Sequence, residues 1–437
     1  MRVFHVFHTL IALLHSPFIT AVAVAAMIPE GNPECQSLPG LKAPGAASPL
    51  RNRYNTGSAC GYLVRDQLRL WFQIAPAVEA AENAPWLIFI NGGPGIADGF
   101  RDPQFLKLRD KYNLVWFNQR GTGLSHLTLA QTSDCKVASL DQNVQDLRAL
   151  QLLLSPNRPV VLIAHSWGGL IAQEFAAFYP SAIMGLIMSG TGPGFEFAHH
   201  AFINGNKSLY PYHDFLVGLL GQASPEIVKR YKAAEAIIAA HLKNGVPVHL
   251  APDNRADRMY APQFIVALKN YFGRIDFDAV PALKLVEGIA AGQISPNGLA
   301  DLGIETAGTN HILNNTILCG DGLPGMLQSL PKEMGQSMSR GCAEITPGCQ
   351  NDPVDFEALP RRISAPTLIL AGTADQVSPV EDQRRLAGLI TGARIVELAG
   401  AQHGEIMEPN FTAFPQILSF LGVASNWTPQ TWQGELR

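Results

Sequence analysis

The segment from Arg158 to Gly169, RPVVLIAHSWGG, constrains the fold of this chain more than any other. It joins an apolar run typical of a buried strand to two glycines and a helix-like stretch that stops at Pro180. A serine at such a strand-to-helix turn is typical of a nucleophile elbow, which holds the hydroxyl out at the edge of a sheet. Ala164 replaces the usual glycine of this motif with the next smallest side chain. The segment therefore predicts Ser166 as a nucleophile.

Similar apolar runs occur before and after this elbow. They cover residues 85–90, 113–119, 183–190, 365–372 and 393–400. A helix-like stretch over 140–154 lies between two of these runs, with its leucines near one face. Continuous apolar strands that alternate with helices indicate a mostly parallel sheet covered on both faces. We therefore predict an α/β class chain with the α/β-hydrolase fold, in which helices flank a mostly parallel central sheet.

The regular alternation breaks off after the strand at 183–190 and returns only near residue 359. We predict four parts, which are a signal peptide at 1–26, a first core part at 27–194, a cap or lid at 195–358 and a second core part at 359–437. The cap is expected to be large, mainly helical and inserted late in the sheet. Ligands bind at the carboxyl ends of the strands in open α/β sheets, so a cap there would cover the site.

The first 26 residues have the pattern of a secretory signal peptide. Arg2 precedes an apolar run from Leu10 to Ala26 that ends in small residues suited to cleavage. An uncleaved membrane anchor is the alternative, but His15, Ser16 and Pro17 interrupt the run. The pattern predicts a secreted or periplasmic protein without stable membrane insertion after cleavage.

The chain has 6 cysteines, and all of them lie beyond this leader. An even number of cysteines in an exported chain predicts disulfide bonds. Neighbours in the sequence suggest Cys35 with Cys60, and Cys319 with either Cys342 or Cys349. Their spacing contains no CxxC pair and does not resemble a zinc site.

A serine hydroxyl needs a base to take its proton and a carboxylate to orient that base. In this fold the chain order is serine, then an acid, then histidine. Asp375 directly follows the strand at 365–372, and His403 directly follows the strand at 393–400. Asp382 is the nearest rival acid, but its place in the sequence suggests a helix surface. We predict Ser166, Asp375 and His403 as the catalytic triad.

The glycine-rich turn NGGPG at 91–95 follows the strand at 85–90. Without side chains, backbone N–H groups of Gly92 or Gly93 could approach a substrate closely. We predict that Gly93 and Trp167 donate the two N–H groups of an oxyanion hole. A plain tight turn is the alternative reading of the glycines taken alone.

Composition excludes several other functions. The formal net charge of -4 and the lack of a basic stripe argue against nucleic acid as a partner. The sequence has no HExxH or similar ligand spacing, so we expect no metal and no cofactor. An epoxide hydrolase or dehalogenase would need an acid where Ser166 stands. A non-catalytic binding protein would be expected to lack a member of the triad.

Three motifs resemble the proline iminopeptidase and tripeptidyl aminopeptidase family of α/β-hydrolase serine peptidases. They are NGGPG at 91–95, NQRGTGLS at 118–125 and HSWGG at 165–169. TILCGDG at 316–322 resembles the exported tripeptidyl-aminopeptidase-like branch, in which a cysteine near the end of the cap accompanies a later one. Three departures from the family are Asn91 for histidine, Asn118 for aspartate and Ala164 for glycine.

The resemblance implies removal of amino-terminal residues from peptides through an acyl-enzyme on Ser166. Asn91 and Asn118 are expected near the substrate mouth, where they put peptide specificity in question. Family members hold the free amine with acids of the cap, and Glu226, Glu235 and Glu287 are candidates among which no motif chooses. The substrate is thus a peptide or, in the alternative reading, a small acyl compound for an esterase, lactonase or small-amide hydrolase.

Overall fold

The structure is a computed structural model of the 437-residue chain. The residues that it describes are 24–28, 59–66, 68–78, 83–97, 100, 103–194, 224–250, 255–260, 264, 279–295, 310–322, 339, 342–343, 348–349, 351, 354–404, 406 and 411–424.

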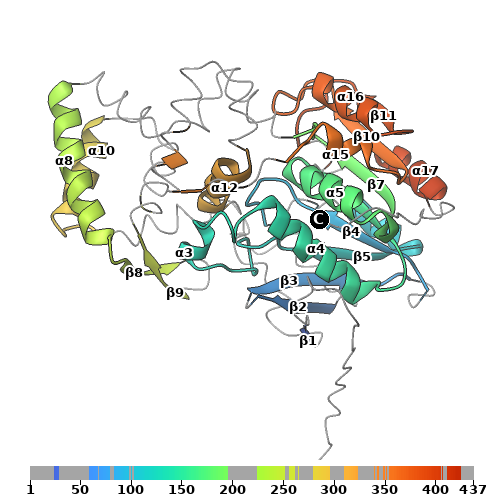
Figure 1. Cartoon of the computed structure of the whole chain (residues 1–437), viewed down its shortest axis with the longest axis horizontal. Helices are drawn as coiled ribbons and strands as arrows, with labels where there is room; N and C mark the ends of the chain where they lie inside the picture. Colours follow the sequence, from blue (N-terminus) through green and yellow to red (C-terminus); the bar gives the residue numbers. More distant parts are fainter. Residues whose placement is uncertain are drawn as a thin grey trace, which may run out of the picture.

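A nine-stranded sheet forms the centre of the molecule, with strand order β1-β2-β3-β5-β4-β6-β7-β10-β11 (Figure 1). The strands are β1 (Val24–Ile28), β2 (Ala59–Arg65), β3 (Leu68–Ala75), β4 (Trp86–Ile90), β5 (Asn113–Phe117), β6 (Val160–His165), β7 (Ile183–Ser189), β10 (Thr367–Gly372) and β11 (Arg394–Leu398). From β5 to β11 all neighbours are parallel, whereas β1, β2 and β3 pair antiparallel. The prediction of a mostly parallel α/β-hydrolase sheet is confirmed.

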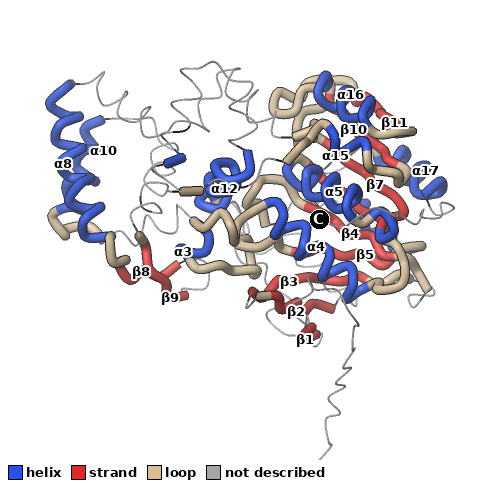
Figure 2. Tube along the Cα trace, viewed as in Figure 1, coloured by secondary structure: helices blue, strands red, loops and turns tan. Residues whose placement is uncertain are grey.

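Helices cover both faces of this sheet, as Figure 2 shows by element type. They are α4 (Leu140–Leu154), α5 (Trp167–Phe178), α15 (Ala358–Arg361), α16 (Val380–Leu389) and α17 (Phe414–Ala424), together with the short helical turns η1 (Pro103–Asp110) and η2 (Pro180–Ala182). In β4, Ile88 and Ile90 pack with the α4 and α5 side, whereas Leu87 and Phe89 pack with η1 and α17. Because both of their faces are buried, the inner parallel strands β4, β6, β7 and β10 are apolar throughout rather than alternating.

The parallel strands, α4 and α5 lie where the apolar runs place them. The α4 helix begins after Ser139, whose side chain accepts a hydrogen bond from the Gln142 N–H, and it spans the predicted residues 140–154. No predicted strand corresponds to β2 or β3, which pair antiparallel with each other. Strand β1 pairs with β2, so the leader boundary predicted at residue 26 falls inside a strand of the sheet.

The segment between β7 and β10 contains a second hydrophobic cluster. Its described elements are α8 (Pro225–Leu242), β8 (Val246–Leu250), β9 (Arg255–Met259), α10 (Ala279–Ala290), α12 (His311–Ile317) and the π-helical turn η3 (Leu318–Gly322). Tyr231 and Ile238 of α8 pack with Val286 of α10 in a core apart from the sheet. The antiparallel pair β8–β9 is a strand element that the mainly helical expectation did not include.

The α8–α10 pair lies at the far left of Figure 1, away from the sheet. The α12 helix lies between this helix pair and the sheet. Two contacts connect this cluster to the core side. Leu129 of α3 (Leu129–Thr132) and Ile312 of α12 pack within it. The Asp257 carboxylate accepts a hydrogen bond of 3.0 Å from the Leu129 N–H. The cluster is therefore attached to the loop that precedes α4.

Two disulfide bonds occur in the described residues, Cys135–Cys349 and Cys319–Cys342. The second matches one of the two pairings expected for Cys319, while Cys135 had no expected partner. The expected pairing of Cys35 falls on a residue outside the described part. Among the described helices, none is both long and apolar enough to cross a bilayer.

Candidate active site

Ser166 stands at the turn between β6 and α5. Its backbone has φ 50 and ψ -122, a conformation that side chains with a Cβ rarely adopt. The turn is close-packed, since a Cβ on Gly168 would lie 2.4 Å from the Asn91 carbonyl oxygen. A Cβ on Gly169 would lie 2.5 Å from the Thr191 side chain. The small residues after the serine therefore allow α5 to start directly against β4 and the loop after β7.

The structure brings the three predicted triad residues into contact. His403 Nε2 lies 3.0 Å from Ser166 Oγ. On the other side of the ring, His403 Nδ1 lies 3.0 Å from Asp375 Oδ2 and 3.1 Å from Oδ1. Asp375 is buried, whereas 24% of the His403 side chain is exposed. A base that contacts both the serine and a buried carboxylate has the arrangement needed to activate the hydroxyl.

The loop after β10 orients the Asp375 carboxylate. Its Oδ1 accepts hydrogen bonds from the N–H groups of Val377 at 2.9 Å and Ser378 at 2.8 Å. The side chain of Gln383 donates toward Oδ2 at 3.4 Å. Asp382, the rival acid, lies on α16. Its Cβ packs near Gly192, where an added Cβ would lie 3.0 Å from the Asp382 Cβ. Asp375 is thus the acid that contacts His403.

The predicted oxyanion residues lie on two sides of Ser166. Trp167 is the first residue of α5 and directly follows Ser166. A Cβ on Gly92 would come within 3.1 Å of Ser166 Cβ, so this loop runs directly beside the serine. Gly93 has φ +120, which favours glycine. The geometry is compatible with N–H groups from both segments near the Ser166 hydroxyl.

Asn91 and Asn118, two of the three departures from the family motifs, share one acceptor. Asn91 Nδ2 donates to the Ala97 carbonyl oxygen at 2.9 Å, and Asn118 Nδ2 donates to the same oxygen at 2.6 Å. Asn118 Oδ1 accepts from the Leu124 N–H at 3.0 Å. Both side chains are buried. They therefore brace the loops after β4 and β5, and their expected effect on peptide specificity stays a prediction.

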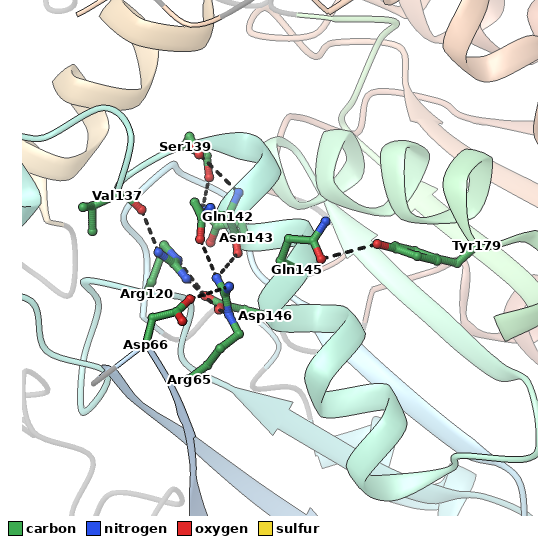
Figure 3. A network of polar contacts seen from close by, with 10 residues as sticks. All are labelled: Arg65, Asp66, Arg120, Val137, Ser139, Gln142, Asn143, Gln145, Asp146 and Tyr179. Carbon is green, nitrogen blue, oxygen red and sulfur yellow. Dashed lines mark hydrogen bonds and ion pairs between the residues drawn. The ribbon is translucent and has the colours of Figure 1, made fainter. Parts of the chain in front are cut away.

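Arg120 of the NQRGTGLS motif belongs to a buried ion network, which Figure 3 shows. Its guanidinium forms two hydrogen bonds of 2.7 Å to the Asp146 carboxylate and one of 2.7 Å to the Val137 carbonyl. Arg65 of β2 donates to the same carboxylate at 2.6 Å and to Gln142 Oε1 at 2.6 Å. The network ties the motif loop and the antiparallel edge of the sheet to α4. We expect this network to stabilise the fold.

His165, the residue before the nucleophile, is buried behind the site. Burial lowers the pKa of His165 well below its ordinary value, and the nearby charge of His403 lowers this pKa further. A hydrogen bond with the Ser189 backbone acts in the opposite direction and raises it, but its effect is smaller. Among the described residues, His165 Nδ1 has no hydrogen-bond partner. His165 is therefore neutral in the folded protein at neutral pH.

The candidate acids for an amine site lie away from Ser166. Glu226 and Glu235 are on α8, and Glu287 on α10 forms an ion pair of 2.7 Å with Arg230. Figure 1 places both helices far from the strands that carry the triad. Within the part of the chain that the structure describes, no group of three or more His, Cys, Asp or Glu side chains could hold a metal ion.

Residues 85–207 match the family described as alpha/beta hydrolase fold. Proline iminopeptidase PfmaB of Pestalotiopsis fici is 32% identical over 130 residues, which are 29% of this chain and 42% of that protein. Epoxide hydrolase 1 of Caenorhabditis elegans is 33% identical over 107 residues, 24% of this chain and 25% of that protein. Proline iminopeptidase of Aeromonas sobria is 26% identical over 124 residues, 25% of this chain and 29% of that protein.

The matched segments span less than half the length of each of these relatives. The family match includes the loop after β4, the elbow and β7, but not the loops that carry Asp375 and His403. Sheet order, elbow and motifs agree with these matches. The chain is therefore an α/β hydrolase by fold, and its core is similar to that of the proline iminopeptidases.

Proposed function

We propose that this protein is a serine hydrolase that works through an acyl-enzyme on Ser166. The observation that carries the proposal is the continuous contact from Ser166 Oγ through His403 to the buried Asp375 carboxylate. The relatives named above include an epoxide hydrolase, but the elbow here carries a serine rather than an acid. Acyl transfer is the chemistry that a serine with this base supports.

In the first step, Ser166 Oγ attacks the substrate carbonyl carbon while His403 Nε2 takes the hydroxyl proton. The charged imidazolium donates from Nδ1 to Asp375, which stabilises it. Collapse of the tetrahedral intermediate breaks the scissile bond, and His403 returns the proton to the leaving amine or alcohol. A water molecule then releases the acyl group, with His403 as base once more.

The negative oxygen of the tetrahedral intermediate needs donors that are already in place. We assign this role to the N–H groups of Gly93 and Trp167, on the loop after β4 and at the start of α5. The proximity of Gly92 to Ser166 supports this assignment. The bracing of the loop by Asn91 and Asn118 supports it as well, because fixed donors need no reorganisation during the reaction.

The substrate class that we propose is a peptide with a free amino terminus, cleaved by an aminopeptidase activity. Similarity to two proline iminopeptidases and the three shared motifs support this class. The acids that would bind the amine are left unassigned. We further propose export to an oxidising compartment. The leader-like first 26 residues and the disulfides Cys135–Cys349 and Cys319–Cys342 support export.

A substrate panel tests the proposal. Purified protein is assayed with aminoacyl and tripeptidyl amides, the same amides with blocked amines, and short-chain acyl esters. Ser166→Ala is compared with Ser155→Ala, a buried serine whose Oγ bonds to the Arg158 carbonyl at 2.8 Å. We expect cleavage of free-amine amides, lost on blocking and in Ser166→Ala only. Cleavage of esters alone would favour the esterase alternative, and activity that survives in Ser166→Ala would refute the nucleophile.

A further inference from the structure

Gln383 is a fully buried glutamine on α16, and its amide lies between the loops that follow β7 and β10. Its Nε2 donates to the Ser378 carbonyl at 2.8 Å and toward Asp375 Oδ2 at 3.4 Å. Its Oε1 accepts from the Gly190 N–H at 3.2 Å. Both ends of the amide are therefore in use.

Only one orientation of the amide satisfies these partners. The Gly190 N–H can only donate, whereas the Ser378 carbonyl and an ionised carboxylate can only accept. The position thus requires a group that combines an acceptor with a donor, which a primary amide provides. A hydrocarbon side chain of the same length would provide neither.

The Asp375 carboxylate depends unequally on its neighbours. Oδ1 accepts from two backbone N–H groups, which belong to the loop itself. Among the described residues, Oδ2 contacts His403 and the Gln383 amide. Without Gln383, the oxygen nearest to His403 Nδ1 would lose its side-chain amide donor.

Gln383 also fixes the backbone under the imidazole. Ser378 Oγ donates to the Gly190 carbonyl at 2.8 Å, so Gly190, Ser378 and Gln383 form a closed ring of hydrogen bonds. Gly190 has φ +58, and a Cβ there would lie 3.1 Å from His403 Nδ1. The ring of hydrogen bonds therefore holds the surface on which the His403 imidazole rests.

We propose that Gln383 is a positioning residue for the triad, which holds Asp375 Oδ2 toward His403 and keeps Gly190 in place beneath the imidazole. This inference rests on the proposed function, because it assumes that Asp375 and His403 activate Ser166. Gln383 itself touches none of the reacting atoms.

The test measures how fast a fluorophosphonate probe phosphonylates Ser166 between pH 5.5 and 9. In this reaction the serine oxygen bonds to phosphorus, fluoride leaves and His403 takes the proton. We expect Gln383→Met to lower the rate about tenfold, as loss of an orienting partner does at other sites. Gln383→Glu should react like the parent at low pH, where a protonated carboxyl both donates and accepts. Its rate should then fall as the introduced carboxyl loses its proton and repels Asp375.

Gln173→Met is the matched control, because Gln173 is as buried as Gln383. Gln173 lies on α5 and donates to the Gly192 carbonyl at 3.2 Å, in the same loop after β7 that contains Gly190. Melting temperatures at each pH establish that every variant is folded at the assay temperature. Equal losses in both methionine variants, a parent-like Gln383→Met, or a parent-shaped pH profile for Gln383→Glu would each overturn the inference. A parent protein that does not react at all would refute the proposed function as well.

Discussion

The imidazole of His165 packs against that of His403, with ring centroids 4.8 Å apart and ring planes tilted by 53°. The buried His165 ring therefore packs directly against the partly exposed ring of the proposed base. It also lies between glycines, since a Cβ on Gly190 would come within 2.8 Å of its Cε1 and a Cβ on Gly92 within 3.1 Å of its Cδ2. The site admits a ring only because both flanking positions lack side chains.

Substitution of His165 should change the pH dependence of stability. Burial holds the pKa of His165 well below 6.5, so below about pH 6.5 the unfolded chain binds a proton that the folded chain does not. The free energy of unfolding should thus fall as the pH decreases through this range. Between pH 6.5 and 5.5, His165 should account for a fall of about 1 kcal/mol in the free energy of unfolding. In His165→Asn this contribution should be absent. Urea denaturation at both pH values measures it, and an unchanged pH dependence would contradict a neutral buried His165.

Glu174 of α5 should act in the opposite direction. Burial, with Asp141 and Asp321 nearby, raises the pKa of Glu174 from 4.5 to about 8. Between these values the folded chain keeps a proton that the unfolded chain releases, so stability falls as the pH rises. Glu174→Gln removes this penalty and should stabilise the protein at pH 7.5 by about 3.5 kcal/mol more than at pH 4.5. If the variant and the parent differ in free energy of unfolding by the same amount at both pH values, the raised pKa of Glu174 would be contradicted.

Loss of Asp146 should destabilise the fold strongly. Its side chain is 1% exposed and faces the guanidinium groups of Arg65 and Arg120. Without Asp146, the buried Arg120 would lose its carboxylate partner, and Arg65 would keep only the exposed Asp66. Breaking a buried ion pair on one side costs about 3–5 kcal/mol. Asp146→Ala should therefore lower the melting temperature sharply. Glu397→Ala, which breaks the exposed pair with Arg384, is the control and should change it far less. Similar shifts in both variants would contradict a structural role for the Arg120 network.

The positive φ of Ser166 at the elbow should lower the free energy of unfolding. Ser166 has φ 50, and a residue with a Cβ in such a conformation costs about 1–3 kcal/mol. Ser166→Gly should therefore raise the free energy of unfolding by about 1 kcal/mol, whereas Ser166→Ala should not. Both variants should be inactive. Thermal unfolding measures the difference, and a less stable glycine variant would argue against strain at this position.

Local sequence patterns were sufficient for much of the fold. The apolar runs of β4, β5, β6, β7 and β10 are buried on both faces, so their composition alone indicates a parallel sheet. Ser166, Asp375 and His403 could be chosen because each directly follows a strand whose end lies at the same edge. Small residues at the elbow supplied a further local signal.

Other features depend on contacts that no local pattern encodes. Gln383 is an ordinary helix residue by sequence, and only the folded chain places its amide beside Asp375. Cys135 and Cys349 are 214 residues apart, so their pairing follows from the docking of the insertion against the loop before α4. The sequence predicts Asn91 and Asn118 near the substrate mouth, and only the folded chain shows that both side chains donate to the Ala97 carbonyl.

The most direct measurement is the intact mass of the protein after reaction with a fluorophosphonate, followed by peptide mapping of the adduct. The parent should gain one phosphonyl group on Ser166, and His403→Ala and Asp375→Ala should react far more slowly. Ser166→Ala should gain none while Ser155→Ala reacts like the parent. An adduct on another residue, or no adduct on the folded parent, would contradict Ser166 as the nucleophile.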